Sequence, residues 1–108
     1  MSYQHIVAFK LASPDLLPSF VEEFKTLSQN CLDKNGQRYI KSIRGGKQIS
    51  PEGMDGGMQV VFIVEFDDKE HAGYYLDNDS AHADFKKLAR VKYQVNGVFC
   101  LDFVEGQF

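Results

Sequence analysis

Hydrophobic residues fall into four short runs, and this pattern predicts four strands. The runs are rich in Val, Ile and Phe, which favour extended structure. They cover Tyr3 to Leu11, Arg38 to Ile43, Met58 to Phe66 and Val98 to Val104. Glycine-rich segments, at Gly45-Gly46 and from Ser50 to Gly57, are expected to connect the second strand to the third.

The region after the first strand predicts an amphipathic helix. Its apolar side chains recur at helical spacing and form one face: Leu17, Phe20, Val21, Phe24, Leu27 and Cys31. Two starts are open, because Ser13-Pro14 gives an N-cap followed by proline at the first helical position, and Pro18 offers a later start. Asn35-Gly36 is expected to end the helix and turn the chain.

Two further helices are predicted between the third and fourth strands. Asp67, with Glu70 three residues later, resembles a capping box and predicts a short helix through about Leu76. Asp79 or the next residue caps a second helix that runs to about Lys92. The order β-α-β-β-α-β predicts a ferredoxin-like α+β subunit with an antiparallel sheet.

Both faces of the predicted sheet are apolar. Residues 60–64 are apolar without a break, and Phe99, Leu101 and Phe103 alternate with other apolar residues. A sheet with helices on one face only should show polar residues at every second position. We therefore expect a homodimer in which sheet packs on sheet. The alternative is that loops cover the strands.

The composition is that of a single domain, residues 1–108. The formal net charge of −3 argues against a nucleic-acid partner, which would need clustered positive charge. No apolar run has the length of a bilayer span, so we expect no membrane association. Cys31 and Cys100 form no CxxC pair and no metal-ligand spacing. This favours free thiols in the cytoplasm and a protein without a bound metal.

Short segments spread over nearly the whole chain occur in a characteristic order. They are His5-Ile6-Val7-Ala8-Phe9-Lys10, Ser50-Pro51-Glu52-Gly53, Val64-Glu65-Phe66-Asp67-Asp68, Tyr74-Tyr75-Leu76, Asp79-Ser80-Ala81-His82-Ala83-Asp84-Phe85 and Leu101-Asp102-Phe103. In this order and spacing the chain resembles the stress-responsive dimeric α/β-barrel domain family, which is related to plant polyketide cyclases of the olivetolic acid type. Ser80 stands where the family pattern usually has proline.

The resemblance implies a subunit that dimerises through its sheets into a barrel, with a pocket between sheet and helices. One plant member of the family is a polyketide cyclase that closes a ring by an intramolecular aldol step without a cofactor. Other members are boiling-stable stress proteins with no established chemistry. The fold therefore does not decide the function.

The cyclase pattern carries over to this chain in part. Its strand-one histidine corresponds to His5 and its catalytic histidine to His82. Its nearby tyrosine corresponds to Tyr75, although one extra residue separates Tyr75 from His82 here. A further pocket tyrosine aligns with Leu27, which is not polar, so the cyclase's own substrate is not expected.

The predicted elements direct both histidines inward. His82 shares a helix face with Phe85, and its place in the first turn favours a neutral imidazole that can act as a base. His5 shares a strand face with Val7 and Phe9. The alternatives are structural: His82 would only hydrogen-bond a neighbouring loop, and His5 would be a satisfied core histidine.

Four other side chains have competing interpretations. Tyr74 and Tyr75 are adjacent on a helix, so only one can face inward and donate to an oxyanion. Asp102 interrupts an apolar strand and would orient a histidine in one interpretation. We favour instead a turn contact or a pairing with Lys or Arg. His71 is expected to be solvated.

We therefore expect a cofactor-free enzyme that acts on a small hydrophobic, carbonyl-bearing, polyketide-like molecule. His82 would remove a proton next to the carbonyl, and His5 with Tyr75 would stabilise the enolate oxygen, giving cyclisation, dehydration or isomerisation. The expected substrate-binding residues are Val7, Phe9, Phe24, Leu27, Phe85 and Tyr74. The alternatives are a non-enzymatic, stable stress-protein oligomer and a protein that binds a hydrophobic ligand without chemistry.

Overall fold

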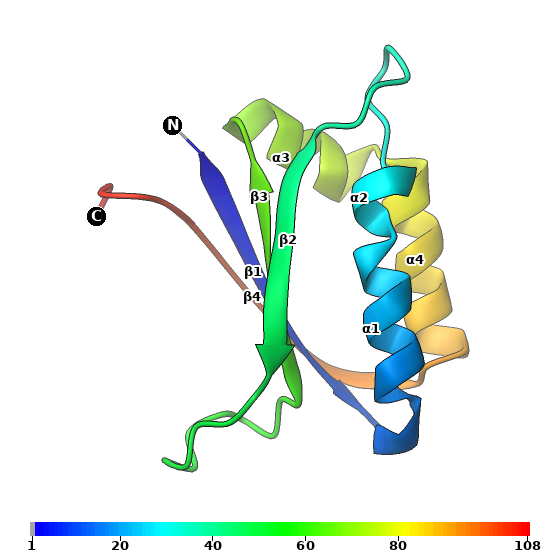
Figure 1. The fold of residues 1–108 in the computed structure, drawn as a ribbon, viewed down its shortest axis with the longest axis vertical. Helices are drawn as coiled ribbons and strands as arrows, with labels where there is room; N and C mark the ends of the chain where they lie inside the picture. The colour runs from blue at the N-terminus through cyan, green and yellow to red at the C-terminus, as the bar shows by residue number, and fades with distance from the viewer. Residues whose placement is uncertain (1) are drawn as a thin grey trace.

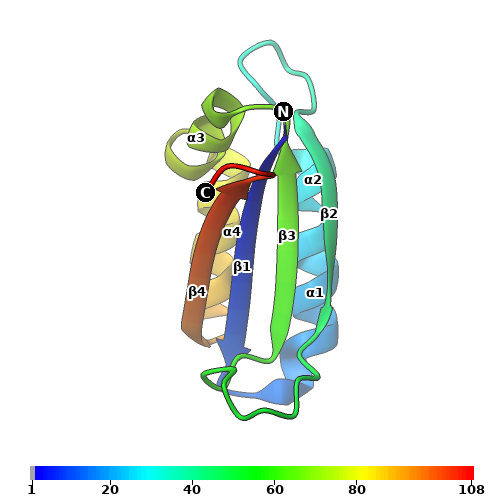
Figure 2. The ribbon, with the colours of Figure 1, turned by 90° about the vertical axis from the view of Figure 1, so that its left-hand side faces the viewer.

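The computed structural model describes residues 2–108 and contains one four-stranded antiparallel sheet. The strands lie in the order β2-β3-β1-β4 (Figure 2). Their bounds are β1 Tyr3–Leu11, β2 Ile40–Lys47, β3 Val60–Phe66 and β4 Val95–Val104. The element order and the antiparallel pairing confirm the predicted ferredoxin-like α+β fold.

The helices cover one face of this sheet. Helices α1 (Leu17–Lys25), α2 (Leu27–Asn30) and α4 (Ser80–Val91) lie over that face, and α3 (Lys69–Asp77) lies at one end (Figure 1). The core between the layers is aromatic. The Phe24 ring stacks on Phe62 with 4.0 Å between centroids, and Phe9 meets Phe20 edge to face at 4.9 Å. Such pairs add to the stabilisation that comes from apolar burial itself.

The first helical region differs from the prediction. It is divided into a 3-10 turn, η1 (Pro14–Leu16), followed by α1 and α2, so both predicted starts are used. Ser13 precedes η1, and Pro18 lies in the first turn of α1. The predicted end at Asn35-Gly36 is wrong, because the helical structure stops at Asn30. The Asp33 carboxylate accepts hydrogen bonds from two following backbone amides, and this local turn competes with helix continuation.

Several strand boundaries differ from the prediction. Strand β2 continues through Gly45 and Gly46 to Lys47, because a glycine at position 45 lets it approach β3; a Cβ there would lie 2.3 Å from the Val61 carbonyl oxygen. Strand β4 begins at Val95 instead of Val98, and β3 at Val60 instead of Met58.

The N-caps of α3 and α4 agree with the prediction only in part. Asp68, and not Asp67, caps α3, since its carboxylate accepts the backbone N–H of His71. Asp79 caps α4, as one of the two predicted alternatives.

The centre of the sheet face opposite the helices is apolar and open. Side chains of β4 point to this face, and Phe99, Leu101 and Phe103 are 57%, 68% and 42% exposed. Ile6 of β1 lies opposite Leu101 in the register, and Ile63 of β3 lies opposite Ile6. Loops therefore cover this face only in part (Figure 2). The exposed apolar side chains agree with the prediction that the sheet has a second apolar face.

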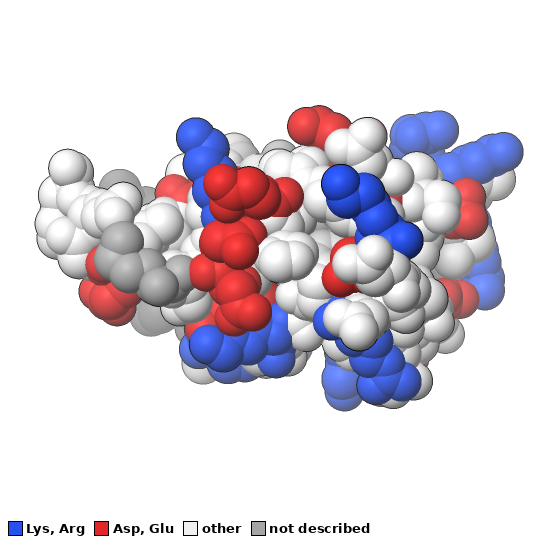
Figure 3. Space-filling view, turned by 90° about the horizontal axis from the view of Figure 1, so that it is seen from above, with Lys and Arg blue, Asp and Glu red and all other residues white. Residues whose placement is uncertain are grey.

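Charged side chains of both signs share the surface. At the end of the molecule that carries α3, acidic and basic groups lie next to each other, and no continuous basic patch appears on that view (Figure 3). None of the helices within residues 2–108 has the length and apolar character needed to cross a membrane.

Candidate active site

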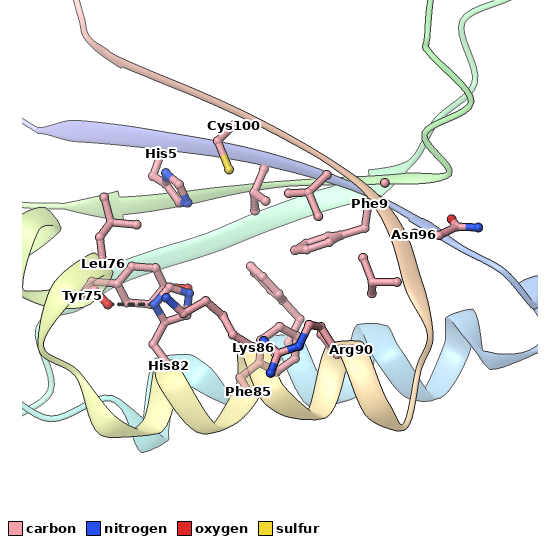
Figure 4. Close-up of a pocket in the computed structure, with 16 residues that line it drawn as sticks. His5, Phe9, Tyr75, Leu76, His82, Phe85, Lys86, Arg90, Asn96 and Cys100 are labelled. Carbon is pink, nitrogen blue, oxygen red and sulfur yellow. Dashed lines mark hydrogen bonds between the residues drawn. The ribbon is translucent and has the colours of Figure 1, made fainter.

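A cavity of about 610 Å³ opens between the sheet and α4 (Figure 4). Its floor is formed by β1 and β4, its wall by α4, and one end by the last turn of α3. Most of the lining is apolar and includes Val7, Phe9, Phe24 and Phe85. Two imidazoles and a tyrosine ring lie together at the α3 end. The cavity therefore combines an apolar chamber with a cluster of titratable groups.

His5 is held by a carboxylate. Its ring is 5% exposed and projects from β1 toward Tyr75 (Figure 4). Nδ1 lies 2.7 Å from Oδ1 of Asp102, the residue directly opposite on β4. An ionised carboxylate can only accept, so Nδ1 carries the proton and Nε2 has a free lone pair when the ring is neutral. The sequence-based preference for a turn contact or a Lys or Arg pairing of Asp102 is therefore wrong.

Asp102 has a second donor that fixes its orientation. The Tyr3 hydroxyl donates to the other carboxylate oxygen, Oδ2, at 2.5 Å. This hydrogen bond and partial burial raise the pKa of Tyr3 to about 12, so the hydroxyl remains a donor at neutral pH. The Asp102 side chain is 28% exposed, at the edge of the sheet. The result is a Tyr3–Asp102–His5 chain of hydrogen bonds that ends in the cavity.

His82 is held by a backbone carbonyl. Its Nδ1 lies 2.7 Å from the Tyr75 carbonyl oxygen, which can only accept. Nδ1 therefore carries the proton, and Nε2 is the basic nitrogen. Burial lowers the pKa of His82 to about 4, and the Lys86 charge adds to this effect while the Tyr75 hydrogen bond opposes it. The predicted neutral imidazole is thus present, with burial as the main cause.

A buried aspartate sets the start of α4 and hence the position of His82. Asp79 is 4% exposed, and its Oδ1 accepts the backbone N–H groups of Ala81 and His82. The Tyr39 hydroxyl donates to its other oxygen, Oδ2. Burial raises the pKa of Tyr39, and the bond to Asp79 raises it further, so Tyr39 stays protonated. The sequence predicts the Asp79 cap but carries no signal for the contact with Tyr39.

Tyr75 lies between the two histidines. Its ring stacks on His82 with 3.7 Å between centroids and an interplanar angle of 14°. It meets His5 edge to face at 6.0 Å. Burial raises the pKa of Tyr75, so its hydroxyl is protonated at neutral pH. His5 is thereby brought into one cluster with Tyr75 and His82, which are seven residues apart in the sequence.

Two of the expected substrate-binding residues lie outside the cavity. Tyr74 points to the other side of α3, where its hydroxyl donates to the Leu32 carbonyl. Leu27 is buried near Phe85, but on the side of α4 away from the cavity. Adjacent helix positions differ by about 100°, which explains why Tyr75 faces the cavity and Tyr74 does not. The other expected residues, Val7, Phe9, Phe24 and Phe85, line it.

The prediction for His71 also needs correction. Its Nδ1 lies 2.8 Å from Asp68 Oδ1, and its ring stacks on Tyr39 with 5.5 Å between centroids. His71 is therefore a partnered, half-buried residue of the α3 cap, outside the cavity.

Two basic residues of the cavity are not among those predicted from the sequence. Lys86 and Arg90 line it from α4, four and eight residues after His82. The spacing places them along the same side of the helix as His82, and this signal was available in the sequence. Within residues 2–108, no three His, Cys, Asp or Glu side chains gather in a group suited to a metal ion.

Comparison with known proteins identifies the family. The family described as the stress responsive A/B barrel domain (Dabb) matches residues 3–105. No curated protein sequence matches the chain. Among solved structures, the Arabidopsis thaliana protein At3g17210 is similar with a TM-score of 0.79 and 18% identity, over 98% of this chain and 97% of that one.

Two other solved structures illustrate the range of similar proteins. The hydroxynitrile lyase from Passiflora edulis has a TM-score of 0.76 and 13% identity, over 99% of this chain and 96% of that one. A dimeric protein of unknown function with a ferredoxin-like fold from Bacteroides fragilis has a TM-score of 0.65 and 19% identity, over 94% of both chains. Identities this low show a shared fold, whereas the family match spans nearly the whole sequence. The chain therefore belongs to the stress-responsive A/B barrel domain family.

Proposed function

We propose that this protein is a cofactor-free enzyme that removes a proton from the carbon next to a carbonyl group of a small hydrophobic substrate. The observation that carries the proposal is the pair of free Nε2 atoms, on His5 and His82, at one end of an apolar cavity. Neutral imidazoles are effective general bases near neutral pH, and an apolar site strengthens their interaction with developing charge.

The geometry favours His5 as the base, in place of the sequence-based assignment to His82. When His5 takes a proton, the Asp102 carboxylate stabilises the resulting imidazolium. His82 has no carboxylate on its ring, and its pKa of about 4 makes it a weak base. Its Nε2 is better suited to accept a hydrogen bond from a substrate hydroxyl.

The proposed step begins with removal of the α-proton by His5 Nε2. The C–H electron pair forms the enolate double bond, and the carbonyl π pair moves to oxygen. The Tyr75 hydroxyl would donate to that oxygen. The enolate then attacks a second carbonyl of the same molecule, or takes a proton back at another position. His5 returns its proton in either case, so no cofactor is consumed.

Cleavage of a cyanohydrin is a second candidate reaction, supported by the fold shared with the Passiflora edulis hydroxynitrile lyase. Here His5 would remove the hydroxyl proton, the C=O bond would form as the C–CN bond breaks, and the released cyanide would take the proton back from His5.

The proposed assembly is a homodimer formed through the apolar sheet faces. The exposed Phe99, Leu101 and Phe103 side chains support it, as does the dimeric state named for the similar Bacteroides fragilis protein. Burial of such an apolar face is the usual source of stability in obligate dimers.

Deuterium exchange tests the proposal without knowledge of the natural substrate. The protein is incubated with 4-phenylbutan-2-one in D₂O, and loss of the α-proton NMR signal is followed. His5→Gln should lower the catalysed rate by about 10² to 10⁴, the range of a general base. His71→Gln is the matched control, because His71 lies outside the cavity. Mandelonitrile, assayed for benzaldehyde release, tests the second reaction.

Equal rates for the wild type and His5→Gln on both substrates would contradict the proposal. Binding of the ketone without exchange would instead support a protein that only carries a hydrophobic ligand.

A further inference from the structure

The cavity carries positive charge along one wall and has no acidic side chain in its lining. Lys86 and Arg90 line it from α4 (Figure 4). None of the lining residues that the structure describes is Asp or Glu. Neither cation forms an ion pair with a carboxylate of residues 2–108. The charges of these two side chains are thus uncompensated beside an apolar chamber.

Two other lysines of the helical layer have ion-pair partners. Lys25 pairs with Glu22, and Lys92 pairs with Glu23. Within residues 2–108, Lys87 of α4 also has no ion pair, but it lines a different surface depression. Lys86 and Arg90 differ from it because they line the cavity. Both side chains are exposed, so an anionic group at this wall would gain an electrostatic attraction that added salt weakens.

We propose that the cavity binds an amphipathic molecule whose carboxylate lies against Lys86 and Arg90 and whose apolar part fills the chamber formed by Phe9, Phe24 and Phe85. This inference rests on the proposed function for the reacting end of the molecule and adds the chemistry of its other end. A planar guanidinium next to an ammonium group is well suited to a carboxylate, since arginine can donate to both oxygens.

The helix geometry sets the spacing within such a ligand. Lys86 follows His82 by one turn and Arg90 by two, which is about 6 Å and about 12 Å along the helix axis. The substrate class is therefore a hydrophobic oxo acid whose carboxylate lies about one to two helix turns from the His82 end of the cavity.

A pair of neutral and anionic probes separates charge recognition from simple apolar burial. Octanoate and octan-1-ol have the same chain length, and NMR titration of the ¹⁵N-labelled protein measures the affinity of each. The wild type should bind octanoate more tightly than octan-1-ol, and higher salt should weaken only octanoate binding. Lys86→Gln/Arg90→Gln should weaken octanoate binding about tenfold, equal to about 1.4 kcal/mol, with octan-1-ol changed by less than about twofold.

Lys87→Gln is the matched control, because Lys87 lies on the same helix but lines a different surface depression, away from the cavity. It should leave both affinities unchanged. Equal affinity of the wild type for the two probes would overturn the inference, as would equal loss for both probes in the double variant.

These outcomes are independent of catalysis. If the proposed function fails, the neutral ketone shows no exchange while octanoate selectivity persists. If only the anion site fails, octanoate selectivity is absent while the ketone still exchanges through His5.

Discussion

Replacement of Asp102 by asparagine tests the most specific part of the site. The side chain keeps its size and can still accept the Nδ1–H of His5, but the negative charge is lost. The imidazolium that forms during proton removal is then no longer stabilised by a charge 2.7 Å away. Asp102→Asn should therefore slow proton abstraction while leaving ligand binding nearly unchanged.

The magnitude follows from the environment of the pair. His5 is buried, but the Asp102 side chain is 28% exposed, so the interaction is weaker than that of a fully buried ion pair. A hydrogen bond to a charged group contributes about 1.5–3 kcal/mol. Because each 1.36 kcal/mol changes a rate tenfold, the exchange rate should fall by about 10- to 150-fold.

The assay is α-proton exchange of 4-phenylbutan-2-one, with ketone affinity measured in parallel. Tyr3→Phe is the control: it removes the hydrogen bond to Oδ2 and retains the carboxylate. Its effect should stay below about fivefold, or about 1 kcal/mol, because the carboxylate charge beside His5 is retained. If Asp102→Asn exchanges at the wild-type rate, or no more slowly than Tyr3→Phe, the carboxylate does not act through His5.

Three further predictions follow from the surroundings of the cavity. The pKa of His82 is lowered from 6.5 to about 4 in the folded state, so the unfolded state binds a proton first as the pH falls. The contribution of neutral His82 to the free energy of unfolding is therefore fully present above about pH 6.5 and is lost toward pH 4, by up to about 3 kcal/mol. Urea unfolding at several pH values measures this loss, which should be smaller in a His82→Gln variant. Tyr39→Phe removes the donor to buried Asp79 and should cost about 1–3 kcal/mol of unfolding free energy, with slower exchange because α4 is less well positioned. Leu101→Glu on the open sheet face should convert a dimer to a monomer in analytical ultracentrifugation. Val91→Glu is the control, because Val91 is similarly exposed but lies on α4, and it should not change the dimer. An unchanged sedimentation coefficient for Leu101→Glu would exclude the sheet face as the interface.

Residue periodicity was sufficient to predict the fold. The apolar runs locate all four strands, and the helical spacing of Phe20 and Phe24 identifies the face that packs on the sheet. Local turn chemistry was harder to read. The Asp33 turn that follows α2 depends on side-chain hydrogen bonds, and Gly45 serves a close approach between strands instead of a loop. Both features become visible only when the neighbouring backbone is in place.

Site residues were predictable where their spacing within one helix or strand determines which way the side chain points. His82 and Phe85 share a helix face, and His5, Val7 and Phe9 share a strand face, so all five line the cavity. The partner of His5 was not predictable in this way. Asp102 meets His5 because of the β1–β4 register, which brings together two residues that are 97 positions apart in the sequence. The protonated Nδ1 of His82 likewise depends on a carbonyl at the end of α3.

The most direct test of the central claim compares the wild-type protein with free imidazole at equal concentration, with α-proton exchange of 4-phenylbutan-2-one in D₂O as the readout. The account predicts that the protein exchanges the α-proton faster than imidazole, with a rate that saturates as the ketone fills the cavity. A rate equal to that of free imidazole and linear in ketone would show that His5 and His82 do not act together on a bound carbonyl compound.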